Sequence, residues 1–309
     1  MEYAVQTEGL RKVYGGVTAV DNLKLDIPQG VLFGLLGPNG AGKSTTLGIL
    51  AGWLKPSAGS ARVLGTPTHR LHELRGQIAA LPQDAAFPPR MAVNHQLLHW
   101  GRLMGMGTRE AETEAKRALQ RVSMSEAGSR LGSELSHGMA KRVGVAQALM
   151  GAPRVLFLDE PTAGLDPASA REMKDLIASL APQATVIVSS HNLAEIQEIC
   201  THGAILDKGR LTTCGTIEAL TRQSREITVE LPVGSTPPLE KLREAFGQDR
   251  VLHRSGVNGS DTLHITFPDT RTTPEVIHAA LTILLESHTP ILGVQRGTSL
   301  ESAFIELTR

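Results

Sequence analysis

Aromatic residues are scarce in this chain, with six Phe, two Tyr and two Trp among 309 residues. Cysteine is scarcer still: only Cys200 and Cys214 occur, and their spacing fits neither a metal site nor a disulfide framework. We therefore expect two ordinary thiols in a reducing compartment. The 41% hydrophobic content allows a sizeable core, which argues against a disordered chain.

A net charge of one sign is also absent, because 31 Lys and Arg balance 31 Asp and Glu. The overall charge thus favours neither nucleic acid nor an anionic membrane surface, and we expect no nucleic-acid partner. No stretch approaches the roughly 20 uninterrupted apolar residues that a spanning helix needs. The first residues carry acids and lack an apolar segment of secretory length, so we expect no signal peptide. Any role at a membrane would be performed from outside the bilayer.

Three short apolar runs lack polar alternation: Val31 to Leu36, Val155 to Leu158 and Thr185 to Val188. Such runs predict strands buried on both faces, and the helical patterns between them indicate an α/β domain with a mainly parallel sheet. Residues able to do chemistry follow each run. Because such sheets bind ligands at the carboxyl ends of their strands, we expect a site there.

Other patterns divide the chain further. Residues 84–150 show helical periodicity at 96–104, 110–122 and 139–150, which we interpret as a helical insert. After about residue 216 the predicted order is strand, helix, strand, strand, helix, strand. This is the ferredoxin-like pattern, with a closing helix near 300–307. We therefore predict a first domain over 1–220 and a small C-terminal α+β domain over 221–309.

A glycine-rich segment after the first apolar run satisfies the spacing G-x-x-x-x-G-K-[ST]. Glycines let successive main-chain N–H groups face a polyphosphate, and the following helix adds the positive end of its dipole. Lys43 would supply charge for the β and γ phosphates, and Ser44 a hydroxyl ligand for magnesium. The alternative is a glycine-rich turn that happens to precede a helix. The predicted nucleotide-binding residues are Gly37, Pro38, Asn39, Gly40, Ala41, Gly42, Lys43, Ser44 and Thr45.

Two adjacent acids, Asp159 and Glu160, end the second apolar run. Burying carboxylates is costly without a cation or donor nearby. A magnesium ion bridged to phosphate would offset that cost for Asp159, while Glu160 could orient and deprotonate an attacking water. The alternative is that the pair caps the helix predicted from Pro167.

Three further polar residues are candidates. His191 ends the third run and could touch a γ phosphate, although a lone histidine can equally cap or pack. Gln83 follows the apparent strand 77–81 and could coordinate metal or water; otherwise it is a polar loop residue. Tyr14 could stack on adenine, or serve only in packing.

The segment Leu135-Ser136-His137-Gly138-Met139 stands before a helix and resembles the signature motif of ABC ATPases, whose usual form is L-S-G-G-Q. The other motifs also stand in family order, so the resemblance covers about residues 2–220. They are Tyr14, the phosphate loop, Gln83, Asp159-Glu160, Gly164-Leu165-Asp166 and His191.

The resemblance implies a P-loop NTPase core of ABC type, with a β subdomain and a helical subdomain, that binds ATP and Mg²⁺. It implies hydrolysis in a homodimer, where Ser136, His137 and Gly138 of one subunit face the phosphate loop of the other. Lys43, Glu160 and His191 would be the catalytic residues, and Ser44, Gln83 and Asp159 the metal-binding ones.

The same resemblance assigns Asp166 to communication across the dimer and Gln83 to sensing integral membrane permease subunits. An extracytoplasmic accessory protein is a further expected partner. The protein would then lie peripherally at the cytoplasmic face of the cell membrane.

Two positions depart from the usual signature. His137 replaces the first glycine, which matters if the main chain needs a positive φ, and Met139 replaces a glutamine amide. The S-x-G-M variant resembles the bacterial exporter branch for drugs, lipids and polysaccharides, whose ATPases often carry an added C-terminal domain. Together with residues 299–304, this similarity favours export.

Two other functions compete with transport. A mechanical ATPase acting on DNA or ribosomes would carry long coiled coils, tandem ATPase units or basic tails, and the sequence has none of these. A regulator that binds nucleotide without hydrolysis is the second alternative, against which the intact Glu160 and His191 argue.

Overall fold

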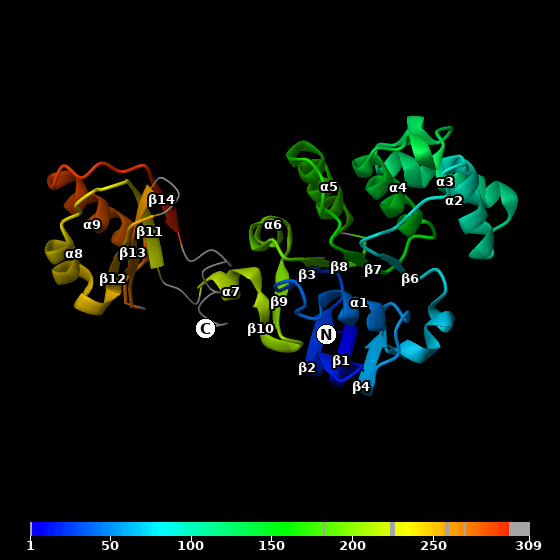
Figure 1. The fold of residues 1–309 in the computed structure, drawn as a ribbon, viewed down its shortest axis with the longest axis horizontal. Coiled ribbons are helices and arrows are strands. Elements are labelled where there is room, and N and C mark those ends of the chain that lie inside the picture. Colours follow the sequence, from blue (N-terminus) through cyan, green and yellow to red (C-terminus); the bar gives the residue numbers. More distant parts are fainter. Residues whose placement is uncertain (1, 182, 223–225, 257–259, 269, 297–309) are drawn as a thin grey trace. The chain divides into compact units, whose positions relative to one another are not determined.

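The computed structural model of the protein describes residues 2–181, 183–222, 226–256, 260–268 and 270–296. These residues fall into two compact units, divided between Ile217 and Glu218 (Figure 1). The closing helix predicted near 300–307 and the segment 299–304 lie outside the described residues.

A six-stranded sheet with the order β10-β9-β3-β8-β7-β6 carries the first unit. All its neighbours pair in parallel except β10 with β9. Every residue of β3, β7 and β8 is buried, as their lack of polar alternation predicts. The strands are β3 (Leu32–Leu36), β6 (Ile78–Leu81), β7 (Val155–Asp159), β8 (Thr185–Ser190), β9 (His202–Asp207) and β10 (Arg210–Thr216).

A second, antiparallel sheet has the order β2-β1-β4-β5. Its inward apolar residues share one hydrophobic core with helix α1 and strand β3. The family resemblance implies this β subdomain, but no run in the sequence marks its strands, because register shifts in the β1–β2 pairing break the alternation. The elements are β1 (Tyr3–Tyr14), β2 (Val17–Pro28), β4 (Ala58–Val63), β5 (Thr66–Pro67) and α1 (Lys43–Leu50).

Three helices form the predicted helical insert beyond the β6 edge of the large sheet (Figure 1). They are α2 (Val93–Leu103), α3 (Thr108–Arg121) and α4 (His137–Leu149). Helix α4 lies close against β6, since a Cβ added at Gly144 would come within 2.8 Å of Leu81 Cδ1. This close packing ties the helical insert to the edge of the sheet.

Two helices follow strands that carry the predicted chemistry: α5 (Pro167–Leu180) follows β7, and α6 (Leu193–Ile199) follows β8. Helix α7 (Ile217–Arg222) follows β10 and crosses the unit boundary. The described residues also form the 3₁₀ helices η1 (Thr68–Leu74), η2 (Ser125–Ala127), η3 (Gly132–Glu134) and η4 (Gln248–Arg250). In the described part of the chain, no helix is both long and apolar enough to cross a membrane.

The second unit is a four-stranded antiparallel sheet of order β12-β13-β11-β14 with two helices. Its apolar residues form a hydrophobic core of their own. The elements appear in the predicted order: β11 (Glu226–Pro232), α8 (Leu239–Phe246), β12 (Val251–Arg254), β13 (Ser260–Thr266), α9 (Thr273–Glu286) and β14 (Gly293–Arg296).

Strand β3 and helix α6 approach so closely that only glycine fits between them. A Cβ added at Gly34 would lie 2.2 Å from Ile196 Cγ2. We expect Gly34→Ala to lower the free energy of unfolding by about 1–3 kcal/mol, because overpacking forces backbone shifts. Urea denaturation followed by circular dichroism measures the change.

Gly107→Ala is the matched control, because a Cβ at Gly107 would meet nothing within 4 Å. Alanine is less favourable than glycine at an N-cap position such as this one, but the variant should still lose less than about 1 kcal/mol. Equal stability losses in the two variants would contradict the close approach at Gly34.

Candidate functional site

The glycine-rich loop lies between β3 and α1, as predicted. Gly42 has a φ of 96°, and a Cβ there would come within 2.4 Å of Ala19 O in β2. Both the backbone conformation and the space therefore require glycine at this position. The turn places Lys43 and Ser44 in the first turn of α1, at the carboxyl end of β3.

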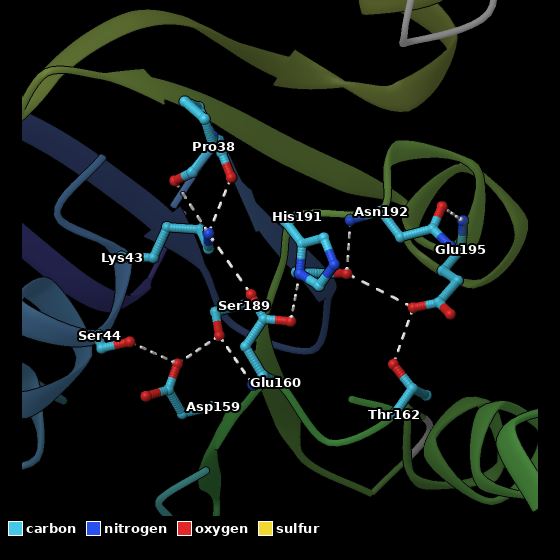
Figure 2. Close-up of polar contacts among 12 residues, drawn as sticks. Pro38, Lys43, Ser44, Asp159, Glu160, Thr162, Ser189, His191, Asn192 and Glu195 are labelled. Atoms are coloured by element: carbon cyan, nitrogen blue, oxygen red, sulfur yellow. Dashed lines mark hydrogen bonds and ion pairs between the residues drawn. The ribbon is translucent and has the colours of Figure 1, made fainter. Parts of the chain in front are cut away.

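Lys43 is almost completely buried, with 5% of its surface exposed. Its Nζ donates hydrogen bonds to Gly37 O at 2.8 Å and Pro38 O at 3.3 Å, and lies 3.4 Å from Glu160 Oε1. The ammonium is thus held by the loop itself and by the predicted general base (Figure 2). This arrangement satisfies the charge without a ligand.

Asp159 ends β7 with its carboxylate beside two hydroxyls. Oδ1 accepts hydrogen bonds from Ser44 Oγ at 3.1 Å and from Ser189 Oγ at 2.5 Å. The capping alternative is wrong for Asp159, because the helix that follows, α5, is capped by Asp166 instead. Ser44 and Asp159, predicted as metal ligands from distant parts of the sequence, therefore lie in direct contact.

Glu160 adopts a left-handed main-chain conformation, with a φ of 46° that is uncommon outside glycine. Its Oε2 lies 2.9 Å from His191 Nδ1, while its other oxygen faces Lys43. His191 does not cap the helix after it, because Asn192 accepts the hydrogen bonds from the N–H groups of α6. The structure thus brings the three predicted catalytic residues into one row, in which an ion pair joins Lys43 to Glu160 and a hydrogen bond joins Glu160 to His191 (Figure 2).

Lys141 is a member of this site that the sequence analysis did not select. From α4, its Nζ donates to Gln83 O at 3.0 Å and to Glu160 O at 3.1 Å. Burial lowers the pKa of this lysine, and the negative charges of Asp84, Glu160 and Asp159 oppose that shift. The signal in the sequence that could have identified Lys141 is its position three residues before Gly144, on the buried side of a helix.

A group of hydroxyls around Glu195 was also missed. Thr162 Oγ1 donates to Glu195 Oε2 at 2.8 Å, and Ser190 Oγ donates to the same oxygen at 3.4 Å (Figure 2). These bonds join the loop after Glu160 to the start of α6. Only the pair of serines before His191 hinted at them in the sequence.

The signature segment begins α4. Ser136 caps the helix by accepting a hydrogen bond from Met139 N at 3.2 Å. His137 is the first helical residue and has no positive φ, so replacing the usual glycine costs no backbone strain. Its Nε2 lies 3.4 Å from Ala163 O, and Gly138 packs near Ser169. The segment therefore lies against Ala163, in the loop before α5, and against Ser169 in the first turn of α5 of its own chain.

Three other predicted residues lie outside the central row. Tyr14 ends β1, is 43% exposed and has Lys12 Nζ 4.9 Å from its ring centroid. Gln83 is exposed and takes part through its carbonyl, which Lys141 contacts. Hydrogen bonds from Ser169 and Ala168 lower the pKa of Asp166, the N-cap of α5.

Comparisons with known proteins agree with this geometry. Residues 20–163 match the family described as ABC transporter. The daunorubicin/doxorubicin resistance ATP-binding protein DrrA of Streptomyces peucetius is 38% identical over 215 residues, which is 69% of this chain and 65% of DrrA. The Nod factor export ATP-binding protein I of Paraburkholderia xenovorans is 31% identical over 99% of this chain and 97% of its own length.

Solved structures are similar over the first unit. The protein cbiO1 from Clostridium perfringens, part of the ABC transporter complex cbiONQ, has a TM-score of 0.64 at 28% identity and covers 72% of this chain and 92% of its own. An ATP-binding cassette in a dimeric post-hydrolysis state, bound to ADP and Pi, shares the fold with a TM-score of 0.64 at 23% identity; it covers 69% of this chain and 98% of its own. The Nod factor export protein is matched over almost its whole length. The phosphate loop, Asp159, Glu160 and His191 also lie together at one edge of the sheet. This chain therefore belongs to the ATP-binding proteins of ABC transporters.

Proposed function

We propose that this chain is the ATP-hydrolysing subunit of an exporter whose membrane-spanning part is a separate polypeptide. The observation that carries the proposal is the row Lys43–Glu160–His191, with Lys43 and Glu160 buried, beside Asp159 and Ser44. Export is favoured because DrrA and the Nod factor protein are named for drug resistance and for export.

In this proposal, each of the three residues of the row has a separate role in ATP hydrolysis. Lys43 binds the β and γ phosphates, exchanging the carboxylate of Glu160 for phosphate oxygens around its ammonium. Glu160, released from Lys43, orients the attacking water and takes its proton. His191 holds the second carboxylate oxygen of Glu160 through Nδ1 and keeps it aimed at the γ phosphate.

Magnesium fits the oxygen atoms at the end of β7. A hydroxyl and a carboxylate oxygen 3.1 Å apart, from Ser44 and Asp159, are ligands of the kind Mg²⁺ takes alongside phosphate oxygens and water. When bound, the ion would neutralise charge on the phosphates. Gln83 is the third proposed ligand. Its side chain is exposed and so can turn toward the site.

The partners follow from the family and from the signature segment. We propose a homodimer through the ATPase domains, in which Ser136, His137 and Gly138 complete the other subunit's phosphate site. Asp166 would communicate the closure of the dimer from one subunit to the other. Tyr14 and residues 37–45 would hold the nucleotide. The assembly would lie at the cytoplasmic face of the cell membrane, with an extracytoplasmic accessory protein as an added partner.

A groove of about 670 Å³ beside Gln83 is the proposed seat of the permease subunit. It lies between the sheet and the helical insert, and Asp84 and Phe87 line it together with both tryptophans of the chain, Trp53 and Trp100. These indoles are 53% and 39% exposed. Exposed tryptophans are typical of surfaces that a partner covers.

For the domain limits, we propose an ATPase domain over residues 1–220, with the helical subdomain near 84–150, and an accessory domain over 221–309. The strand order β12-β13-β11-β14 and the two crossing helices support a ferredoxin-like type for the accessory domain.

Substituting the general base separates binding from hydrolysis. We expect Glu160→Gln to bind ATP and dimerise while kcat falls by about 10²–10⁴-fold, because the amide cannot take the proton. Phosphate release measures turnover, and size-exclusion chromatography with ATP measures the dimer. Wild-type turnover would remove Glu160 from its assigned role.

Lys43→Ala provides the contrast for this experiment. Loss of the ammonium should weaken ATP affinity by about tenfold or more, since hydrogen bonds to charged groups contribute roughly 1.5–3 kcal/mol. Fluorescent ATP titration measures the affinity. Unchanged affinity would contradict the exchange of Glu160 for phosphate at Lys43.

The groove can be tested by shortening both indoles. We expect the Trp53→Ala, Trp100→Ala double variant to lose copurification with its integral membrane subunit, identified by mass spectrometry, while the ATPase rate of the isolated chain stays within about twofold. Tyr3→Ala, at an aromatic residue of similar exposure in β1, should copurify normally. Normal copurification of the double variant would refute the docking site.

Removing the accessory domain tests its independence. Because the two units have separate hydrophobic cores, a chain ending at Arg222 should fold and bind ATP within about threefold of the full-length affinity. Fluorescent ATP titration of both forms measures this. A larger loss would assign the accessory domain a part in forming the nucleotide site.

A further inference from the structure

Glu160 has a main-chain conformation that its own residue type does not favour. Its φ of 46° lies in the left-handed region, which a non-glycine residue keeps only where the surrounding structure holds it in place. The conformation also turns the carboxylate toward Lys43 and His191. The groups that maintain this backbone therefore determine where the carboxylate points.

Two side chains from different parts of the fold hold the peptide groups of Glu160. On the amino side, Glu160 N donates to Ser189 Oγ at 2.9 Å. On the carbonyl side, Lys141 Nζ donates to Glu160 O at 3.1 Å. Ser189 is fully buried and Lys141 is 8% exposed, so water cannot readily replace either partner.

Among the residues that the structure describes, Lys141 has no carboxylate as its hydrogen-bond partner, although it is a buried cation. Both of its acceptors are main-chain carbonyls, Glu160 O and Gln83 O. The burial of an ammonium is costly, and burial accordingly lowers the pKa of Lys141. The two hydrogen bonds of this lysine connect α4 to Gln83 on one side of the site and to Glu160 on the other.

We propose that Lys141 is a positioning residue for hydrolysis. From α4, the helix that the signature segment begins, it fixes the left-handed main chain of Glu160 and links it to Gln83. Ser189 holds the same peptide from the opposite side. This role rests on the proposed function of Glu160. It adds a direct mechanical connection between α4 and the general base of the same chain.

Lys141→Met and Lys141→Gln form a matched pair, since both side chains have similar length and only glutamine keeps an N–H donor. We expect Lys141→Met to lower kcat by about 10²-fold, the typical loss when a catalytic group moves by roughly 1 Å. ATP affinity should stay within about twofold, because the hydrogen bonds of Lys141 go to the main chain of Gln83 and Glu160, outside the phosphate loop. Lys141→Gln should recover most of the lost kcat.

Lys116→Met is the control, because Lys116 is an exposed lysine on α3 of the same helical insert. It should leave kcat and ATP affinity unchanged. Wild-type kcat in Lys141→Met, or equal kcat losses in the methionine and glutamine variants, would overturn the positioning role.

A double-mutant cycle with Glu160→Gln separates this inference from the function it rests on. Where Glu160 is already replaced, Lys141→Met should cost no more than about twofold in single-turnover rate. A loss as large as in the wild-type background would show that Lys141 acts elsewhere. If Glu160→Gln alone hydrolyses normally, the proposed function fails whatever Lys141 does.

Ser189→Ala gives a second route should Lys141→Met fail to fold, which thermal melting would reveal. It removes the acceptor for Glu160 N, and with it the hydrogen bond to Asp159 Oδ1, while leaving Lys141 in place. We expect a lower kcat at saturating magnesium and ATP, with ATP affinity within about twofold. An unchanged kcat in Ser189→Ala would overturn the proposal.

Discussion

Two carboxylates at the end of one buried strand dominate the electrostatics of this protein. Asp159 and Glu160 are 8% and 5% exposed, and carboxylates in such positions are costly unless they are paired. Two buried lysines, Lys43 and Lys141, balance their charge. These elements have to converge because β7 leads into both carboxylates, while α1 supplies Lys43 and α4 supplies Lys141.

The sheet edge explains why these residues come from so many parts of the chain. β3, β7 and β8 are adjacent and parallel, so the residues that follow them meet at one edge. Gly34 sets the distance between β3 and α6, and the start of α6 lies just beyond His191. Packing in the interior thus fixes the position of a histidine whose ring is half exposed.

The sequence could predict the parts of the site whose chemistry is local. Unbroken apolar runs indicated buried strands, and the loop spacing indicated Lys43 and Ser44. Lys141 and Ser189 were not selected, because no motif links either of them to the main chain of Glu160, which they reach only through tertiary packing. The strands β1 and β2 were not placed either, since bulges interrupt their alternation. The effect of His137 on the backbone could not be predicted either, because the residue type alone does not reveal that its φ is helical.

The contact between Lys43 and Glu160 has a consequence for ligand discrimination. The carboxylate of Glu160 lies 3.4 Å from the ammonium of Lys43, so it competes with any incoming anion for that ammonium at a high effective concentration. An anion that binds Lys43 must first displace this carboxylate. A polyphosphate that also reaches the N–H groups of the loop gains further hydrogen bonds, which offset this cost. The ion pair therefore favours ligands that contact Lys43 and the loop together over ligands that contact Lys43 alone.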